Sequence, residues 1–259
     1  MPPRHLENVA EGGGEQSRLL GGGDPARFDI KRATDEVRKG FVRKVYGVLT
    51  GQLILTALIA YVLYQAGQDR SWLHSHEWLL WVSVIMTVSS ICVMACCENL
   101  CRRYPTNYFF LFTFTAFEAV MIGFISAMYS WQGVLLATGV TMAVFLLLTV
   151  FAFSAGLDFT GSGPYLFIAI MMLLVFGLVL SVLGLLHVRF TWATVLYDAL
   201  AVLIFSFYIV FDTQLMLGQW GGHRTSFSVD DYVFAALNLY MDIVNLFIHL
   251  LSLLGSRND

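Results

Sequence analysis

Charged residues are scarce in this chain. Only 13% of its 259 residues are Asp, Glu, Lys or Arg, whereas 58% are hydrophobic, and the mean hydropathy is +0.70. Soluble domains carry about 25% charged residues and about 45–50% apolar ones. No charged residue occurs between Glu118 and Asp158, or from Phe159 to Val188. Because a membrane-spanning helix takes about 20 apolar residues, each of these runs holds one or two crossings, and composition excludes a soluble protein.

Cysteine is also rare, and its four residues stand close together. Cys92, Cys96, Cys97 and Cys101 fall along one side of a single predicted helix. Disulfides within one helix have poor geometry, and the Cys-x2-Cys pair typical of zinc sites is missing. We therefore predict buried, small apolar side chains rather than a metal site.

The first 44 residues lack the apolar core that a signal peptide needs. They are polar and rich in glycine, and they carry nine of the fifteen basic residues. This composition predicts a retained, disordered tail over residues 1–44, followed by a membrane domain over 45–254 and a short C-terminal tail over 255–259.

Seven apolar segments follow the tail and predict an all-α membrane protein, a seven-transmembrane-helix bundle. They cover residues 45–66, 77–100, 107–128, 132–154, 164–187, 192–217 and 232–254. With the N-terminus in the cytoplasm, twelve of the fifteen Lys and Arg residues fall on the cytoplasmic side. This asymmetry predicts a cytoplasmic N-terminus and a C-terminus on the opposite side of the membrane.

Carboxyl groups inside apolar helices are informative because each charged group costs at least about 2.5–3.5 kcal/mol to insert. Asp242 lies near the middle of the last segment, and three polar residues share its helical face: Asn238, Asn245 and His249. Such a face should contact protein or water rather than lipid. Asp212 lies in the preceding segment, so two facing carboxyls are expected.

Two adjacent carboxyls in a low dielectric cannot easily both ionise, and they share a proton. The pair formed by Asp212 and Asp242 could act as a pH switch, a cation site or an acid catalyst, or could simply be a structural hydrogen-bonded pair. Glu118 has two interpretations: it lines the same cavity, or it is protonated and bonded to a neighbouring helix. Asp198, near the far end of its segment, is expected to be solvated at the interface.

Three segments resemble motifs of the transmembrane Bax inhibitor motif family. Residues 208–214 (YIVFDTQ) resemble its sixth-helix motif, and residues 235–247 (AALNLYMDIVNLF) resemble its seventh-helix motif. Residues 96–98 (CCE) followed by 102–108 (RRYPTNY) are similar to the lifeguard branch in particular. The resemblance covers roughly residues 35 to 256.

The resemblance implies a bundle with the last helix central and a calcium leak that restrains cell death from the endoplasmic reticulum or Golgi membrane. It assigns the pH sensor and gate to Asp212 and Asp242, which would also bind calcium transiently, with Arg102 or Arg103 as gate partner. Glu118, Asn238, Asn245 and His249 are expected to line the pore or its polar face. Calcium is the permeant ion, and no cofactor is expected. The expected partners are lipid, calcium, protons and membrane proteins of cell-death or calcium-release pathways, not nucleic acid.

Other functions remain open at this point. Intramembrane aspartyl proteases also place one aspartate on each of two adjacent helices, but they need Gly-x-Gly before the second aspartate, where this chain has bulky residues, Leu239, Tyr240 and Met241. The sequence therefore does not favour an enzyme. A non-conducting adaptor that binds apoptosis or channel proteins fits the same apolar outer faces.

Overall fold

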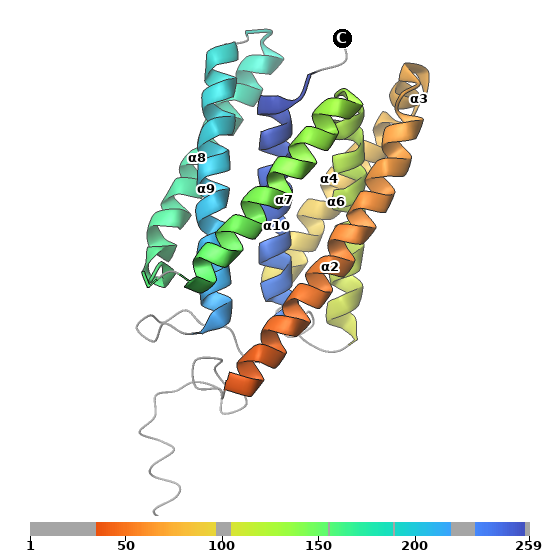
Figure 1. Cartoon of the computed structure of the whole chain (residues 1–259). Helices are drawn as coiled ribbons and strands as arrows, with labels where there is room; N and C mark the ends of the chain where they lie inside the picture. Colours follow the sequence, from red (N-terminus) through yellow and green to blue (C-terminus); the bar gives the residue numbers. More distant parts are fainter. Residues whose placement is uncertain (1–34, 97–104, 155, 189, 219–230, 257–259) are drawn as a thin grey trace, which may run out of the picture.

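The described part of the chain folds into helices. The computed structural model describes residues 35–96, 105–154, 156–188, 190–218 and 231–256. The long helices lie side by side in one bundle (Figure 1), together with the short helix α3 (Arg70–Ser75) and the 3-10 turn η2 (Thr160–Ser162). The long helices are α2 (Asp35–Ala66), α4 (Glu77–Cys96), α6 (Thr106–Ala127), α7 (Trp131–Ser154), α8 (Gly163–Leu185), α9 (Thr191–Leu217) and α10 (Tyr232–Leu254).

The predicted boundary of the N-terminal tail is wrong, because α2 begins at Asp35 rather than at residue 45. Two acidic residues, Asp35 and Glu36, stand in its first turn, where they interact favourably with the helix dipole. Phe41 and Val45 are buried, at 1% and 0% exposure, so tertiary packing holds this polar first part of the helix. The helices α6 to α10 agree with their predicted segments to within two residues at each end.

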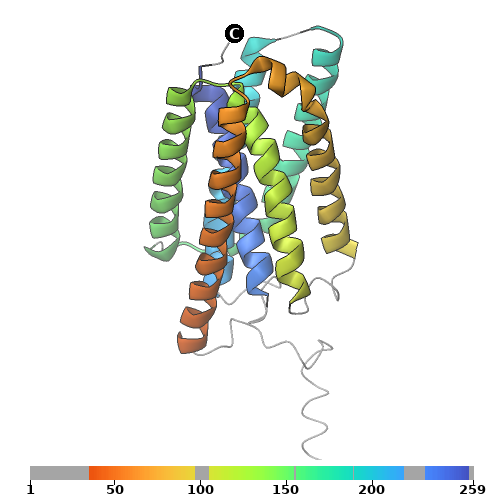
Figure 2. The same cartoon turned by 90° about the vertical axis from the view of Figure 1, so that its right-hand side faces the viewer.

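Helix α10 lies at the centre of the bundle, as the family resemblance implied. It packs against α9, α7, α2 and α6. In its most apolar 18-residue stretch 67% of the residues are buried, whereas the corresponding share for α8 with η2 is 11%. Figure 2 shows α10 (blue) inside the other helices. Helix α10 ends at the end of the bundle opposite the start of α2 (Figure 1). We call the end where α2 begins the near end and the other the far end.

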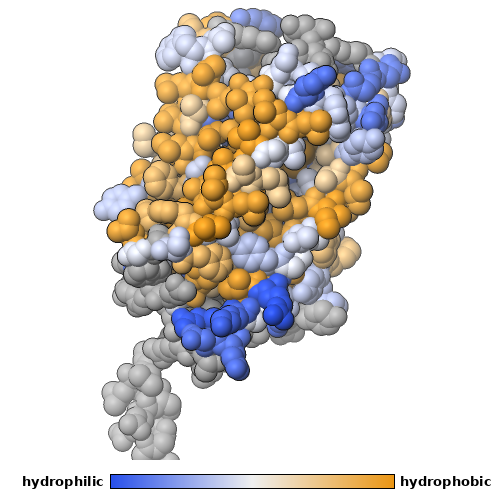
Figure 3. Space-filling model, viewed as in Figure 1, coloured by the Kyte–Doolittle hydropathy of each residue, from blue (hydrophilic) through white to orange (hydrophobic). Residues whose placement is uncertain are grey.

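The outer surface is that of an integral membrane protein. Six of the described helices are long and apolar enough to cross a membrane: α2, α6, α7, α8 with η2, α9 and α10. Helix α4, Glu77–Cys96, has 20 residues and is not one of these six. Figure 3 shows apolar residues over most of the visible face, with hydrophilic residues gathered towards the two ends. An apolar surface of this extent needs lipid to cover it.

Helices α2 and α6 approach each other closely at a glycine. A Cβ atom on Gly123 of α6 would lie 2.7 Å from Leu63 Cβ and 3.2 Å from Ala60 Cα of α2. Further along, a Cβ on Gly67 would lie 2.6 Å from Ala127 Cβ. The two helices therefore run in the same direction with their backbones in near contact.

Candidate functional site

Asp212 of α9 and Asp242 of α10 lie next to each other inside the bundle. They are 8% and 6% exposed, and their carboxyl groups lie close enough to interact directly. Because a carboxylate has only acceptors, a hydrogen bond between the two groups needs a proton on one of them. The structure thus brings together the two carboxyls that were expected to face each other.

Tyr208 is a further polar group at the aspartate pair. It lies on α9, close enough to interact electrostatically with both carboxyls, and Asp242 Oδ2 is buried without a hydrogen-bond partner. In a separate group, the buried hydroxyls of Tyr46, Thr149 and Thr213 lie near one another without a hydrogen bond of ordinary geometry. Buried polar atoms of this kind usually bind water or an ion.

Apolar side chains close the bundle between the aspartate pair and the near end. Met216 lies one turn beyond Asp212 on α9, and the residues from α10 precede Asp242 by about two turns. We call this set the near-end apolar cluster, and it consists of Phe41, Val45, Met216, Ala235 and Ala236, all at most 4% exposed. Lys44 lies 5.2 Å above the Tyr232 ring and further ties α2 to α10 there. Buried apolar side chains therefore lie between the aspartates and the near end along α9 and α10.

Gln214, the last residue of the sixth-helix motif, has a structural role. It is fully buried, and its Nε2 donates to Leu157 O at 2.9 Å, while its Oε1 accepts from Phe159 N at 2.8 Å. Gly218, with φ 60, then ends α9 in the left-handed conformation that glycine adopts readily. Asp212 is therefore held on a helix end that is fixed to the connection between α7 and α8.

The expectation that Asp198 is solvated is wrong. Asp198 is 5% exposed, its Oδ1 lies 2.7 Å from His249 Nδ1, and its Oδ2 accepts a hydrogen bond of 2.5 Å from Ser252 Oγ. Phe205 stacks on the His249 ring, with centroids 6.0 Å apart. The position of Asp198 near the end of its helix predicted solvent, whereas α10 covers the side chain and supplies both partners.

The polar face predicted on α10 does not form one site. His249 pairs with Asp198 rather than facing the aspartate pair, and Asn238 is exposed. Asn245 is half-buried, and its Nδ2 donates to Met241 O of its own helix at 2.8 Å. The four residues do share a helical face, but each height along α10 has different neighbours, so each residue has a different environment.

Glu118 lies in the middle of α6, 4% exposed, and Thr87 Oγ1 of α4 donates to its Oε2 at 3.4 Å.

Arg102 and Arg103, the predicted gate partners, lie outside the described residues. Of the cysteines, Cys92 is exposed, so the prediction that it is buried is wrong; it stands on the outer side of α4. Within the described segments, no three His, Cys, Asp or Glu side chains are close enough to hold a metal ion.

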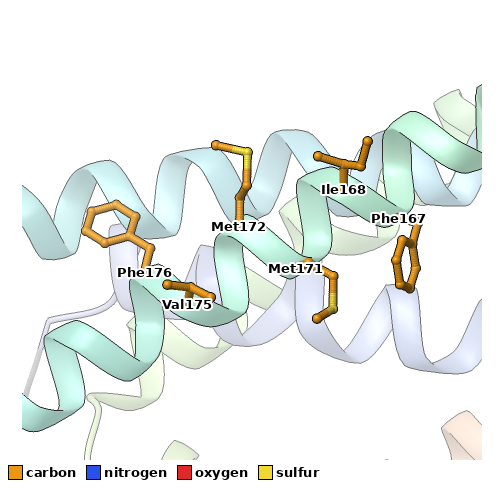
Figure 4. A pocket seen from close by; sticks show the side chains of 6 residues that line it. All are labelled: Phe167, Ile168, Met171, Met172, Val175 and Phe176. Atoms are coloured by element: carbon orange, nitrogen blue, oxygen red, sulfur yellow. The ribbon is translucent and has the colours of Figure 1, made fainter.

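A shallow apolar hollow on the surface of α8 supplies no polar group. It is lined by Phe167, Ile168, Met171, Met172, Val175 and Phe176, which project from one stretch of the helix (Figure 4). Four of these side chains, Phe167, Ile168, Met172 and Val175, are more than half exposed. The hollow belongs to the surface that lipid covers, and the polar chemistry of the protein lies inside the bundle.

Comparison with known proteins agrees with this arrangement. Residues 38–259 match the family described as "Inhibitor of apoptosis-promoting Bax1". The chain is 31% identical to human Protein lifeguard 3 and 29% identical to its mouse counterpart, over 100% of this chain and 82% of each relative. It is 32% identical to Bax inhibitor 1 of Schizosaccharomyces pombe, over 89% of this chain and 82% of that protein. A match over nearly the whole helical bundle, which includes the buried aspartates on α9 and α10, places the chain in the transmembrane Bax inhibitor motif family, with lifeguard proteins among its relatives.

Proposed function

We propose that this chain is a pH-sensitive calcium leak channel of an internal membrane, the endoplasmic reticulum or the Golgi, and that it restrains cell death. The observation that carries the proposal is the buried contact between Asp212 and Asp242 at the interface of α9 and α10. The restraint of cell death is inferred from the matching family, inhibitors of apoptosis-promoting Bax1, and from the similarity to a Bax inhibitor.

The aspartate pair has the properties of a gate. With one shared proton, the two carboxyls hold α9 and α10 together above the near-end apolar cluster. Loss of that proton leaves two negative charges that repel each other, while a second proton removes the strong charge-assisted bond between them. Both changes loosen the contact, and apolar constrictions conduct only when they open enough to admit water.

The membrane arrangement completes the proposal. Helix α4 lies against α6 and runs alongside the other helices through much of the bundle (Figure 2), so we assign it as the seventh crossing. An odd number of crossings places the two chain ends on opposite sides, and the basic residues at the start of the chain place the near end in the cytoplasm. Calcium prefers oxygen ligands, and the exposed carboxylates of an open pair would attract it transiently.

The test is calcium flux from liposomes that hold the purified chain, measured across a pH series. Flux is expected to be lowest where the pair holds one proton and to rise on both sides of that pH. Asp212→Asn and Asp242→Asn should each flatten this dependence, and the double variant should be little worse than either single one. Glu36→Gln, which changes an exposed carboxylate of α2, is the matched control and should keep the wild-type profile.

Two results would count against the proposal. Absence of flux from the folded wild-type chain at every pH would favour the non-conducting adaptor. A wild-type pH profile in both folded aspartate variants would place the switch elsewhere in the molecule.

A further inference from the structure

A second buried polar cluster lies between α2, α4, α6 and α10, and it does not include the aspartate pair. Its side chains are all at most 8% exposed, and they are Gln52, Thr56, Thr87, Thr115, Glu118 and Tyr240. Glu118 stands twelve residues into the 22-residue helix α6, so the cluster lies near the middle of the bundle. The directions of its hydrogen bonds show what else it can bind.

The hydroxyl of Thr115 fixes the orientation of Gln52. Thr115 Oγ1 donates its only proton to Leu111 O at 2.8 Å, so its contact of 3.0 Å with Gln52 must be an acceptance from the amide Nε2. This assignment leaves Gln52 Oε1 as a fully buried acceptor with no partner. A buried acceptor without a donor is costly, by about 1–3 kcal/mol, and it points to a ligand or water.

The hydroxyl of Thr56 fixes the direction of the Tyr240 hydrogen bond in the same way. Thr56 Oγ1 donates to Gln52 O at 2.8 Å, so Tyr240 Oη, also 2.8 Å away, donates to Thr56. The lone pairs of Tyr240 Oη therefore remain available as acceptors.

The remaining free groups lie at neighbouring levels of the bundle because α2 and α6 run in the same direction. Thr56 lies four residues after Gln52, and Glu118 lies three residues after Thr115, so Tyr240 Oη reaches the level of Glu118. Glu118 and Tyr240 interact electrostatically. Among the described residues, no Lys, Arg or His side chain pairs with Glu118, and the second amide hydrogen of Gln52 is the one donor left in the cluster.

We propose that Glu118, Gln52 Oε1 and Tyr240 Oη form a transit site for a partly hydrated calcium ion, separate from the aspartate gate. An acceptor-rich cluster with a single carboxylate suits calcium, which takes oxygen ligands and completes its shell with water. A site with one negative charge and neutral oxygens binds calcium weakly. Weak binding is needed because a permeant ion must leave the site again. This inference deepens the proposed calcium leak and rests on it, although it concerns ion binding rather than gating.

The experiment measures binding of terbium, an oxygen-seeking substitute for calcium, to the full chain in detergent. Tyrosine excitation sensitises terbium luminescence at close range, and calcium should displace the bound terbium and lower the signal.

The Asp212→Asn/Asp242→Asn double variant serves as the background, so that the gate contributes no binding. In that background, Glu118→Gln keeps the shape and an amide donor for Gln52 but removes the charge, and it should weaken calcium-displaceable binding more than about tenfold. Tyr240→Phe and Gln52→Met should weaken it less, and Glu36→Gln should leave it unchanged.

The opposite results overturn the site. If Glu118→Gln binds terbium as tightly as its background, or if the background binds none, Glu118 is a protonated structural group that donates to Gln52. If Glu118→Gln does not fold, Tyr240→Phe decides, and unchanged binding in that variant rejects the site. Wild-type flux separates the two proposals: a chain that binds terbium through Glu118 but passes no calcium has the site without the leak.

Discussion

Buried ionisable side chains are the residues on which this protein depends, because a charge inside an apolar helix is stable only with suitable partners. The structure gives the buried carboxyls three different kinds of partner. Asp212 and Asp242 contact each other, Asp198 binds a histidine and a serine, and Glu118 receives one long hydrogen bond from a threonine. The best satisfied carboxyl is therefore Asp198, and the least satisfied is Glu118, which is consistent with a structural role for the first and a binding role for the second.

The pair formed by Asp198 and His249 is predicted to stabilise the far end of the bundle. Asp198→Leu leaves the His249 ring and the Ser252 hydroxyl buried without their acceptor, and it should lower the free energy of unfolding by about 3–5 kcal/mol. Ser252→Ala, which removes one donor, should cost about 1 kcal/mol. Thermal unfolding of the purified chain in detergent compares the variants.

Non-additivity provides the control for this prediction. Replacing both members in Asp198→Leu/His249→Leu should be less harmful than the sum of the single changes, since no buried charge is left unpaired. An Asp198→Leu variant as stable as Ser252→Ala would show that the pair is solvated after all.

At the scale of the elements, α10 connects the three polar sites. Tyr240, Asp242 and His249 lie in sequence along this one helix, and they contact α2, α9 and again α9 at different heights. A shift or rotation of α10 against its neighbours would therefore change all three contacts together. Its central position, covered by four other helices, makes it the element through which a change in the aspartate pair can reach the rest of the bundle.

The packing of α2 against α6 is predicted to depend on Gly123. Gly123→Ala places a methyl group 2.7 Å from Leu63 Cβ and 3.2 Å from the α2 backbone, so the helices must separate, at a cost of about 1–3 kcal/mol. Gly139→Ala on α7 is the matched control, because nothing lies within 4 Å of its Cβ, and it should be neutral or slightly stabilising. Melting temperatures in detergent test the difference, and equal values for the two variants would contradict the close contact.

At the scale of the whole molecule, the outer surface is apolar, and the largely apolar interior holds a few buried polar groups. Large hydrophobic side chains are exposed on most of the outer helices, whereas the buried carboxyls lie inside the bundle. An exposed apolar surface is unlike that of a soluble protein, and it suits a solvent that offers no hydrogen bonds. The protein is thus organised to carry polar chemistry inside a lipid bilayer.

The arrangement of the ends is a prediction about the whole chain. In sealed microsomes, a tag at the N-terminus should be open to added protease, and a tag at the C-terminus should be protected, because the excess of basic residues at the start of the chain predicts a cytoplasmic near end. Detergent should expose both tags equally. Two accessible ends in sealed vesicles would rule out an odd number of crossings and therefore the assignment of α4 as a span.

The sequence by itself determined the membrane class, the ends of the helices α6 to α10 and which carboxyls lie within the helices. These features depend on local composition: apolar runs long enough to cross a bilayer, breakers between them, and rare charges within them. The adjacency of α9 and α10 in the chain also made the contact between Asp212 and Asp242 predictable, because consecutive helices joined by a short loop pack together.

Only the tertiary structure decided which polar residues are partners. The face shared by Asn238, Asp242, Asn245 and His249 was correctly derived from the helical repeat, but the neighbours at each height come from helices distant in sequence. Asp198 and Ser252 are 54 residues apart, and Gln52 and Thr115 are 63 apart, so no local pattern links them. The start of α2 at Asp35 was missed for the same reason, since a polar segment becomes helical there by packing Phe41 and Val45 against α9 and α10. Local chemistry sets the elements, whereas the register between helices sets the sites.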